Sequence, residues 1–192
     1  MSSKETERQF LSVLGGYLVS LPFDLKILQE AVADPDLDRS AREIAAGAIV
    51  HTLMPQEGEG PLRFADDVLI VRAALKAVAD RGGEAFGAFR DRFGDAYATL
   101  DQDIALFDEA LDDIWRWLAG KVEGFPKLPY KGRRAGGYVD DDESQSFLYD
   151  EGLEFETNFN VTEQQVSNRV RRLEQVVDLL KKRRAEEARK IG

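Results

Sequence analysis

Two stretches of the chain carry apolar residues at alternating intervals of four and three, and this spacing constrains the fold more than any other feature. In the first stretch these residues are Leu100, Ile104, Phe107, Leu111, Ile114 and Leu118. In the second they are Val166, Val170, Leu173, Val177 and Leu180. Such spacing places side chains on one face of an α-helix. Each stretch is too short for a stable isolated coiled coil, so we expect both to pack on the rest of the chain or on a second copy.

Outside these two stretches, the first 124 residues predict helices separated by breaks at proline, glycine and aspartate residues. A break at Leu21-Pro22 separates a first helix over 4–19 from a second over 22–33, because proline suits the first turn of a helix. Further helices are expected over 40–54, 62–80, 84–93 and 100–118. Together they predict a helical bundle core over residues 1–124.

The last third of the chain changes character. Residues 125–143 hold prolines, glycines and basic residues, which predicts a linker or a loop lying across the acidic helical body. Alternating apolar and polar residues over 144–161 predict a small β-hairpin. Thr162 and Gln165 have the spacing of a capping box for a last helix. The predicted fold class is therefore mainly α: a helical bundle core (1–124), a linker (125–143), and a β-hairpin followed by an amphipathic C-terminal helix (144–192).

Charge is distributed unevenly along the chain. The sequence has 36 acidic and 26 basic residues, a net charge of −10, and such an acidic body repels the phosphate backbone of nucleic acids. Residues 140–163 are acidic, whereas residues 164–192 are basic. We therefore expect no nucleic-acid partner, and we expect the basic end to dock on an acidic surface of this chain or of a protein partner.

The N-terminal sequence mixes acidic and basic residues and lacks the pattern of a secretory signal. The longest apolar stretches, residues 10–23 and 44–55, are shorter than the roughly 20 residues that cross a membrane. These features predict a protein of the bacterial cytoplasm. Peripheral membrane contact through residues 10–23 or through the basic tail is the alternative.

Few side chains could carry catalysis. The chain has no cysteine and one histidine, which excludes thiol nucleophiles, Cys-based metal sites and multi-histidine centres. His51 has no carboxylate beside it in the sequence, so we interpret it as a structural histidine. No phosphate-binding loop or nucleophile elbow is present. The sequence thus predicts a non-catalytic protein without a cofactor.

One group of acidic residues is a candidate site for a divalent cation. Its members are Glu57, Glu59, Asp66 and Asp67, and hard cations prefer such carboxylate oxygens. The spacing does not match an EF-hand loop. Adjacent residues on a helix also point about 100° apart, so the backbone alone does not aim both aspartates at one point.

Several short segments between residues 31 and 79 have a recognisable order. They are Asp34-Pro35, the apolar helix 44–53, Met54-Pro55-Gln56-Glu57, and Asp66-Asp67 followed by an apolar helix. In this order the region resembles the YkvA-like bacterial family of unknown function, although Glu57 stands where that family usually has aspartate. The resemblance implies an all-helical core. Members of that family are small helical proteins, often described as membrane-associated, with no established activity.

These observations favour a protein-interaction or scaffold protein that binds a protein partner or a second copy of itself. The predicted contact residues are those of the second apolar stretch, Val166, Val170, Leu173, Val177 and Leu180. The main alternative is an acidic inhibitor or immunity-type protein that masks a basic surface with helix 101–113. A carboxylate–metal protein or enzyme centred on Glu57, Glu59, Asp66 and Asp67 is a third hypothesis.

Overall fold

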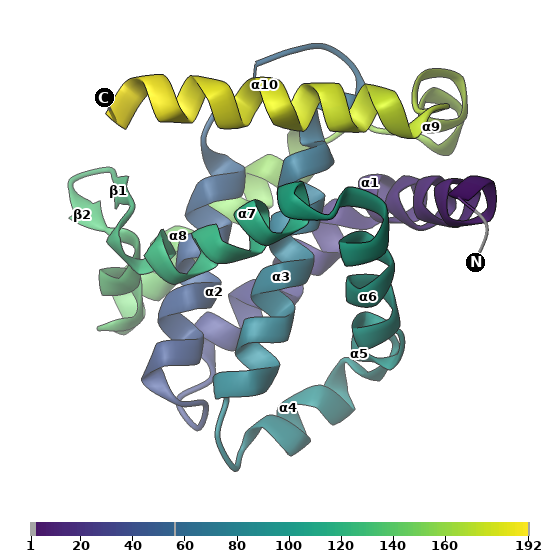
Figure 1. The fold of residues 1–192 in the computed structure, drawn as a ribbon. Helices are drawn as coiled ribbons and strands as arrows, with labels where there is room; N and C mark the ends of the chain where they lie inside the picture. Colours follow the sequence, from purple (N-terminus) through teal and green to yellow (C-terminus); the bar gives the residue numbers. More distant parts are fainter. Residues whose placement is uncertain (1–2, 56, 192) are drawn as a thin grey trace.

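The computed structural model describes residues 3–55 and 57–191, and the chain is almost entirely helical over these residues (Figure 1). The mainly α fold class is confirmed, and one two-stranded ribbon is the only sheet in the described part. The α-helices are α1 (Ser3–Ala33), α2 (Arg39–Leu53), α3 (Ala65–Arg81), α4 (Phe86–Arg92), α5 (Gly94–Ala98), α6 (Leu100–Leu111), α7 (Asp113–Lys121), α8 (Asp142–Asn158), α9 (Glu163–Arg169) and α10 (Leu173–Ile191). The 3-10 turns are η1 (Pro61–Phe64), η2 (Val122–Lys127) and η3 (Ala135–Val139), and the antiparallel strands are β1 (Pro129–Tyr130) and β2 (Arg133–Arg134).

Helices α1, α2 and α3 form the centre of the molecule, and the later elements pack around them (Figure 1). Helix α3 is buried along its first three turns, from Ala65 to Leu75. Helix α1 contacts α2, α3, α6, α8 and α9. One continuous hydrophobic core joins residues from all three predicted units, including Leu148 of α8 and Leu180 of α10. The segments that follow residue 124 are therefore part of the same packed body.

Helix α1 is one continuous helix, and the predicted break at Pro22 was wrong. Leu18, Leu21 and Leu25 are buried on both sides of the proline. Burying this uninterrupted apolar face compensates for the backbone hydrogen bond that proline removes. By length and composition alone α1 could also cross a membrane, and 44% of its most apolar window is buried inside the protein. Core helices of ordinary globular domains satisfy the same criterion.

The first apolar stretch forms two helices instead of the predicted one. Helix α6 ends at Leu111, and α7 begins at Asp113. Between them Asp112 has a positive φ of 47°, which no α-helical residue adopts, and so the helix ends there. The apolar residues on both sides remain in the core. The spacing thus identified the buried face correctly and missed the change of direction.

The predicted β-hairpin over 144–161 was wrong, because these residues form most of α8. Asp141 caps this helix by accepting a hydrogen bond from the backbone N–H of Ser144. The side facing the body follows helical spacing, with Leu148 and Gly152 buried and Phe155 half-buried. Gly152 leaves room for Gln29 of α1, whose side-chain amide donates to the Tyr149 carbonyl at 3.0 Å. This close approach to α1 requires a helix at the position where the alternating pattern indicated strands.

Residues 125–143 lie across the helical body, which was one of the two predicted arrangements. They contain the end of the 3-10 turn η2, the turn η3 and the short ribbon of β1 and β2, and both turns pack on α2. Their buried side chains are Phe125, Ala135, Tyr138 and Val139. Gly47 allows the approach on the α2 side, because a Cβ atom there would lie 2.5 Å from the Phe125 carbonyl carbon.

The last predicted helix is also divided in two. The capping box of Thr162 and Gln165 is present and begins α9, but residues 170–172 are not helical and α10 follows them. Helix α10 runs along one side of the bundle, at the top of Figure 1. A carboxylate oxygen of Glu7 accepts the backbone N–H of Leu173 at 3.1 Å and so anchors its first turn to α1.

A buried arginine of α3 connects this helix to α1 and α6. Arg72 of α3 is 1% exposed, and its guanidinium lies 3.5 Å from an Asp24 oxygen and 3.7 Å from an Asp103 oxygen. It donates a hydrogen bond to the Ala96 carbonyl at 2.8 Å and stacks on the Tyr17 ring. Because a buried charge is costly without partners, this group ties α1, α3 and α6 together.

Substituting Gly47 with alanine tests the close contact between α2 and η2. The new methyl group would overlap the Phe125 backbone, which cannot move without disturbing η2. We expect a loss of roughly 1–3 kcal/mol in unfolding free energy, measured by urea denaturation. The matched control is Gly16→Ala on α1, where no atom lies within 4 Å of the new Cβ. That variant should be neutral or up to about 1 kcal/mol more stable, and equal losses in the two variants would contradict the packing argument.

Asp24→Asn tests the cost of burying the Asp24 carboxylate beside Arg72. Burial raises the pKa of Asp24 to about 6, and the nearby Arg72 guanidinium lowers it only in part. Because this pKa lies above that of an unfolded aspartate, the protonated Asp24 favours the folded state near pH 4, and this contribution is lost as the pH rises through 6. When the pH is raised from about 4 to about 7, the unfolding free energy of the variant should therefore rise by roughly 2–3 kcal/mol relative to that of the unmodified chain. Urea unfolding at both pH values measures this difference, and a constant difference would show that Asp24 titrates normally.

Candidate functional site

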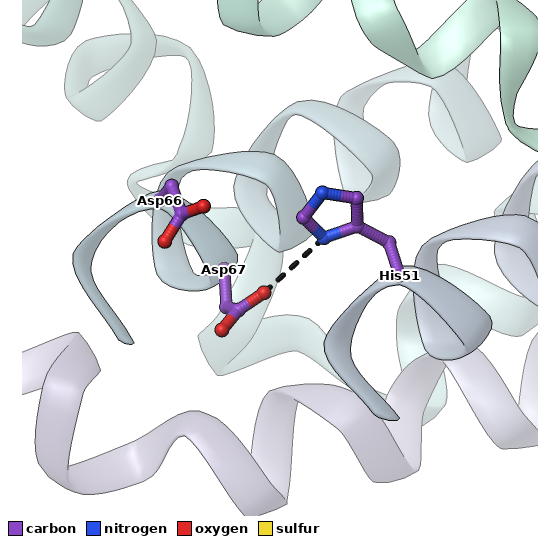
Figure 2. Close-up of side chains that lie close together, drawn as sticks. All are labelled: His51, Asp66 and Asp67. Atoms are coloured by element: carbon purple, nitrogen blue, oxygen red, sulfur yellow. Dashed lines mark hydrogen bonds and ion pairs between the residues drawn. The ribbon is translucent and has the colours of Figure 1, made fainter. Parts of the chain in front are cut away.

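Three side chains that offer metal-ligand atoms meet between α2 and α3 (Figure 2). His51 comes from the last turn of α2, and Asp66 and Asp67 come from the first turn of α3. One ligand atom from each residue lies within 4.8 Å of the others. This cluster, called the His-Asp-Asp cluster below, is the only such group in residues 3–55 and 57–191.

The local sequence explains how the cluster is placed. Helix α2 ends at Leu53, and the glycine-containing loop and η1 turn the chain back into α3. The last turn of α2 therefore lies beside the first turn of α3, as Figure 2 shows. On the other side of the imidazole, the ring of Phe125 lies 5.1 Å from that of His51, centroid to centroid. Gly47, one turn before His51, permits this packing.

His51 and Asp67 form the buried half of the cluster. The His51 Nδ1 atom lies 3.2 Å from an Asp67 carboxylate oxygen, with the Asp67 side chain fully buried and that of His51 13% exposed. Burial raises the pKa of Asp67 well above its usual value. Burial, together with the nearby Lys121 ammonium, lowers the pKa of His51 to about 3. Near neutral pH the imidazole is therefore uncharged, which leaves a nitrogen lone pair available.

Arg183 of α10 completes the other half of the cluster. Its guanidinium forms an ion pair with Asp66, and these side chains are 12% and 6% exposed. It also donates to the backbone carbonyl of Arg63 at 2.8 Å and to that of Glu57 at 3.3 Å. One carboxylate and two carbonyl oxygens thus surround a positive charge that comes from a remote part of the chain.

Helix α10 covers the cluster and is held mainly at its middle. Val176 and Leu180 are its fully buried residues. Beyond the Arg183–Asp66 pair, Glu187 forms an ion pair with Lys121 of α7, and Arg184 forms one with Asp113 at 2.7 Å. Arg183 and Arg184 of the basic end thus pair with acids of the same chain, whereas Glu187 pairs in the opposite sense with Lys121.

The predicted metal-ligand set is divided by the structure. Asp66 and Asp67 lie together in the cluster, whereas Glu57 and Glu59 are exposed in the preceding loop and lie outside it. His51, which we interpreted as a structural histidine, lies beside both aspartates. One signal in the sequence indicated this position: two charges open an otherwise apolar helix, and buried charges require partners.

The predicted partner-binding residues are mostly turned inward. Val166 and Val170 are 9% and 8% exposed, Leu180 is fully buried, and Leu173 and Val177 are partly buried. Val176, which lies outside the predicted spacing, is fully buried because the break at 170–172 shifts the register of α10. In this conformation the apolar face of the C-terminal helices packs on their own body.

Comparisons with protein-family models, with curated proteins and with solved structures give no match. The similarity of residues 31–79 to the YkvA-like family therefore stays a prediction, and function has to be argued from the geometry. In chemical terms the cluster offers one imidazole and two carboxylates, which are ligands for a divalent cation. Thr52, the hydroxyl residue next to His51, donates its proton to the Ala48 carbonyl at 3.1 Å, so it is not poised as a nucleophile.

Arg183→Met tests whether the buried ion pair holds α10 in place. The substitution keeps much of the side-chain volume but leaves the buried Asp66 without its guanidinium, which should cost about 3 kcal/mol in unfolding free energy. The matched control is Arg184→Met, which removes an exposed pair one residue further along the same helix and should change stability little. Adding Asp66→Asn to Arg183→Met should restore part of the loss. Equal effects of the two arginine variants in urea unfolding would contradict a special role for Arg183.

Proposed function

We propose that this chain is a non-catalytic protein-interaction protein of the cytoplasm that associates with a second copy of itself through its C-terminal arm. The C-terminal arm consists of α9 and α10, residues 163–191. In the closed form the arm docks on its own body. In the associated form the same face docks on the body of the other copy.

The observation that carries this proposal is the way the arm is attached. Its contact with the body consists of a few buried apolar side chains and several ion pairs that come from distant segments. The surface that receives it lies on α1, α7 and η1. A second copy presents the same surface, so every contact of the closed form can be made between two chains.

The connections of the arm also suit such an exchange. Residues 159–162 join α8 to α9, and residues 170–172 join α9 to α10, and neither segment is helical. Changes of backbone angle in these short segments would move the arm without unfolding either helix. Exchange of an identical element is a low-cost route to a dimer, because the contacts that are lost are made again.

The acidic-inhibitor alternative has less support from the geometry. Helix α6 ends before the acidic stretch is complete, so the acids do not share one straight face. Asp103 is buried and accepts hydrogen bonds from Tyr17 and Thr99. Arg184 and Lys76 pair with two of the exposed acids, Asp113 and Asp101. The acidic surface left for a basic partner is thus smaller than the sequence indicates.

Light scattering after size-exclusion chromatography tests self-association. We expect the mean mass of the full chain to rise from monomer towards dimer as concentration increases. Deleting residues 163–192 should abolish this rise, because the exchanging element is gone. A full chain that remains monomeric over the whole concentration range would contradict the proposal.

A closed arm offers a sharper comparison than a deletion. The chain has no cysteine, so Lys121→Cys with Glu187→Cys and a short bis-maleimide would join α10 to α7 at an existing ion pair. This cross-linked monomer should no longer dimerise. The matched control is Lys76→Cys with Asp101→Cys, which joins α3 to α6 and leaves the arm free. Equal dimerisation of the two cross-linked proteins would place the interface elsewhere.

A further inference from the structure

We propose that His51, Asp66 and Asp67 bind a divalent transition-metal ion, with zinc as the best match, and that this ion competes with Arg183 of α10 for Asp66. The proposal goes beyond self-association, since a single copy of the chain contains all three ligands. It also assigns a second role to α10, which covers the ion site when Arg183 is docked.

The geometry of the His-Asp-Asp cluster suits a small ion. Ligand atoms around tetrahedral zinc, each about 2.1 Å from the metal, lie about 3.4 Å from one another. The His51 nitrogen and the Asp67 oxygen already lie 3.2 Å apart, and the Asp66 carboxylate lies within 4.8 Å of both. Figure 2 shows the two carboxylates and the imidazole converging from two adjacent helices. Small side-chain rotations would therefore bring all three atoms to one ion.

A second observation indicates a cation at this place. The cluster already holds a positive group, because the Arg183 guanidinium is bound by Asp66 and by the carbonyls of Glu57 and Arg63. This guanidinium comes from a helix more than 100 positions away in the sequence. Burial lowers the pKa of Arg183, so the charged guanidinium depends on these oxygen partners. An incoming ion would replace one cation by another at the same oxygens.

The charges around the cluster favour exchange over simple addition. Lys121 and Arg183 provide two positive charges near His51, and Glu187 offsets part of that charge. A divalent ion added to this set would be repelled by both cations. When Arg183 leaves, that repulsion falls and the Asp66 carboxylate becomes available. Binding of the ion is therefore expected to loosen α10.

The donor set also narrows the class of ion. Magnesium and calcium prefer oxygen ligands only, whereas imidazole nitrogen favours zinc and other first-row transition metals. Two carboxylates with one histidine form a mixed set that zinc accepts with an additional ligand from solvent. We therefore expect zinc to bind more tightly than magnesium or calcium.

Isothermal titration calorimetry of the metal-free full chain with zinc chloride tests the site. We expect one zinc ion per chain and no binding of magnesium at the same concentrations. Asp67→Asn should lower zinc affinity about tenfold or more, since it removes a ligand while its amide still fills the buried position. Arg183→Met should raise zinc affinity about tenfold, since it removes the competing cation.

The matched control is the exposed loop acid Glu59. Glu59→Gln should leave zinc affinity unchanged, because this side chain lies outside the cluster. A drop in affinity for this control, with none for Asp67→Asn, would mean that zinc binds the loop and would overturn the proposal. Absence of zinc binding in both the unmodified chain and Arg183→Met would overturn it as well.

Hydrogen exchange measures the competition with α10 directly. Saturating zinc should speed amide exchange over residues 173–191 in the unmodified chain, whereas α2 and α3 should become more protected. Zinc binding with unchanged exchange in α10 would refute the competition with Arg183. Light scattering of the same samples separates this result from self-association, because zinc binding by a strictly monomeric chain would support the site and contradict the proposed dimer.

Discussion

The structure depends on the burial of three ionisable side chains along one central helix. Asp66, Asp67 and Arg72 of α3 are 4%, 0% and 1% exposed, and each lies among apolar residues. A buried charge is stable only with well-placed partners, and here the partners come from other helices. Asp66 is paired with α10, Asp67 lies beside His51 of α2, and Arg72 lies between acids of α1 and α6. These requirements determine which helices surround α3.

The same constraint also acts on the docking of α10. A helix that docked through apolar area alone would remain in place whatever ions are present. Helix α10 instead docks partly by supplying a guanidinium to a buried carboxylate. If a metal ion binds as proposed, the position of α10 depends on whether Arg183 or the ion occupies Asp66. Self-association and metal binding, as proposed above, both act on this one contact.

The candidate site was only partly predictable. Asp66 and Asp67 were predicted as candidate ligands because two acids begin an apolar stretch of helix, and hard cations prefer carboxylate oxygens. His51 was set aside because no carboxylate lies near it in the sequence, yet the turn between α2 and α3 brings Asp67 to 3.2 Å. The charge pattern predicted only that the basic end, which includes Arg183, docks on an acidic surface. The contact of Arg183 with Asp66 joins residues too far apart for any local pattern to indicate.

The sequence by itself determined the helical class, the buried face of α6 and α7 and the start of α9, because apolar spacing and the capping box act over a few residues. It did not determine where helices stop or change direction. The alternation over 144–161 predicted strands, whereas most of these residues form α8, which packs closely on Gln29 of α1 at Gly152. The breaks at Asp112 and at 170–172 likewise direct apolar faces onto a core formed by remote segments. The tertiary structure decides where these helices end, because the contacts that stabilise each break are made with residues distant in the chain.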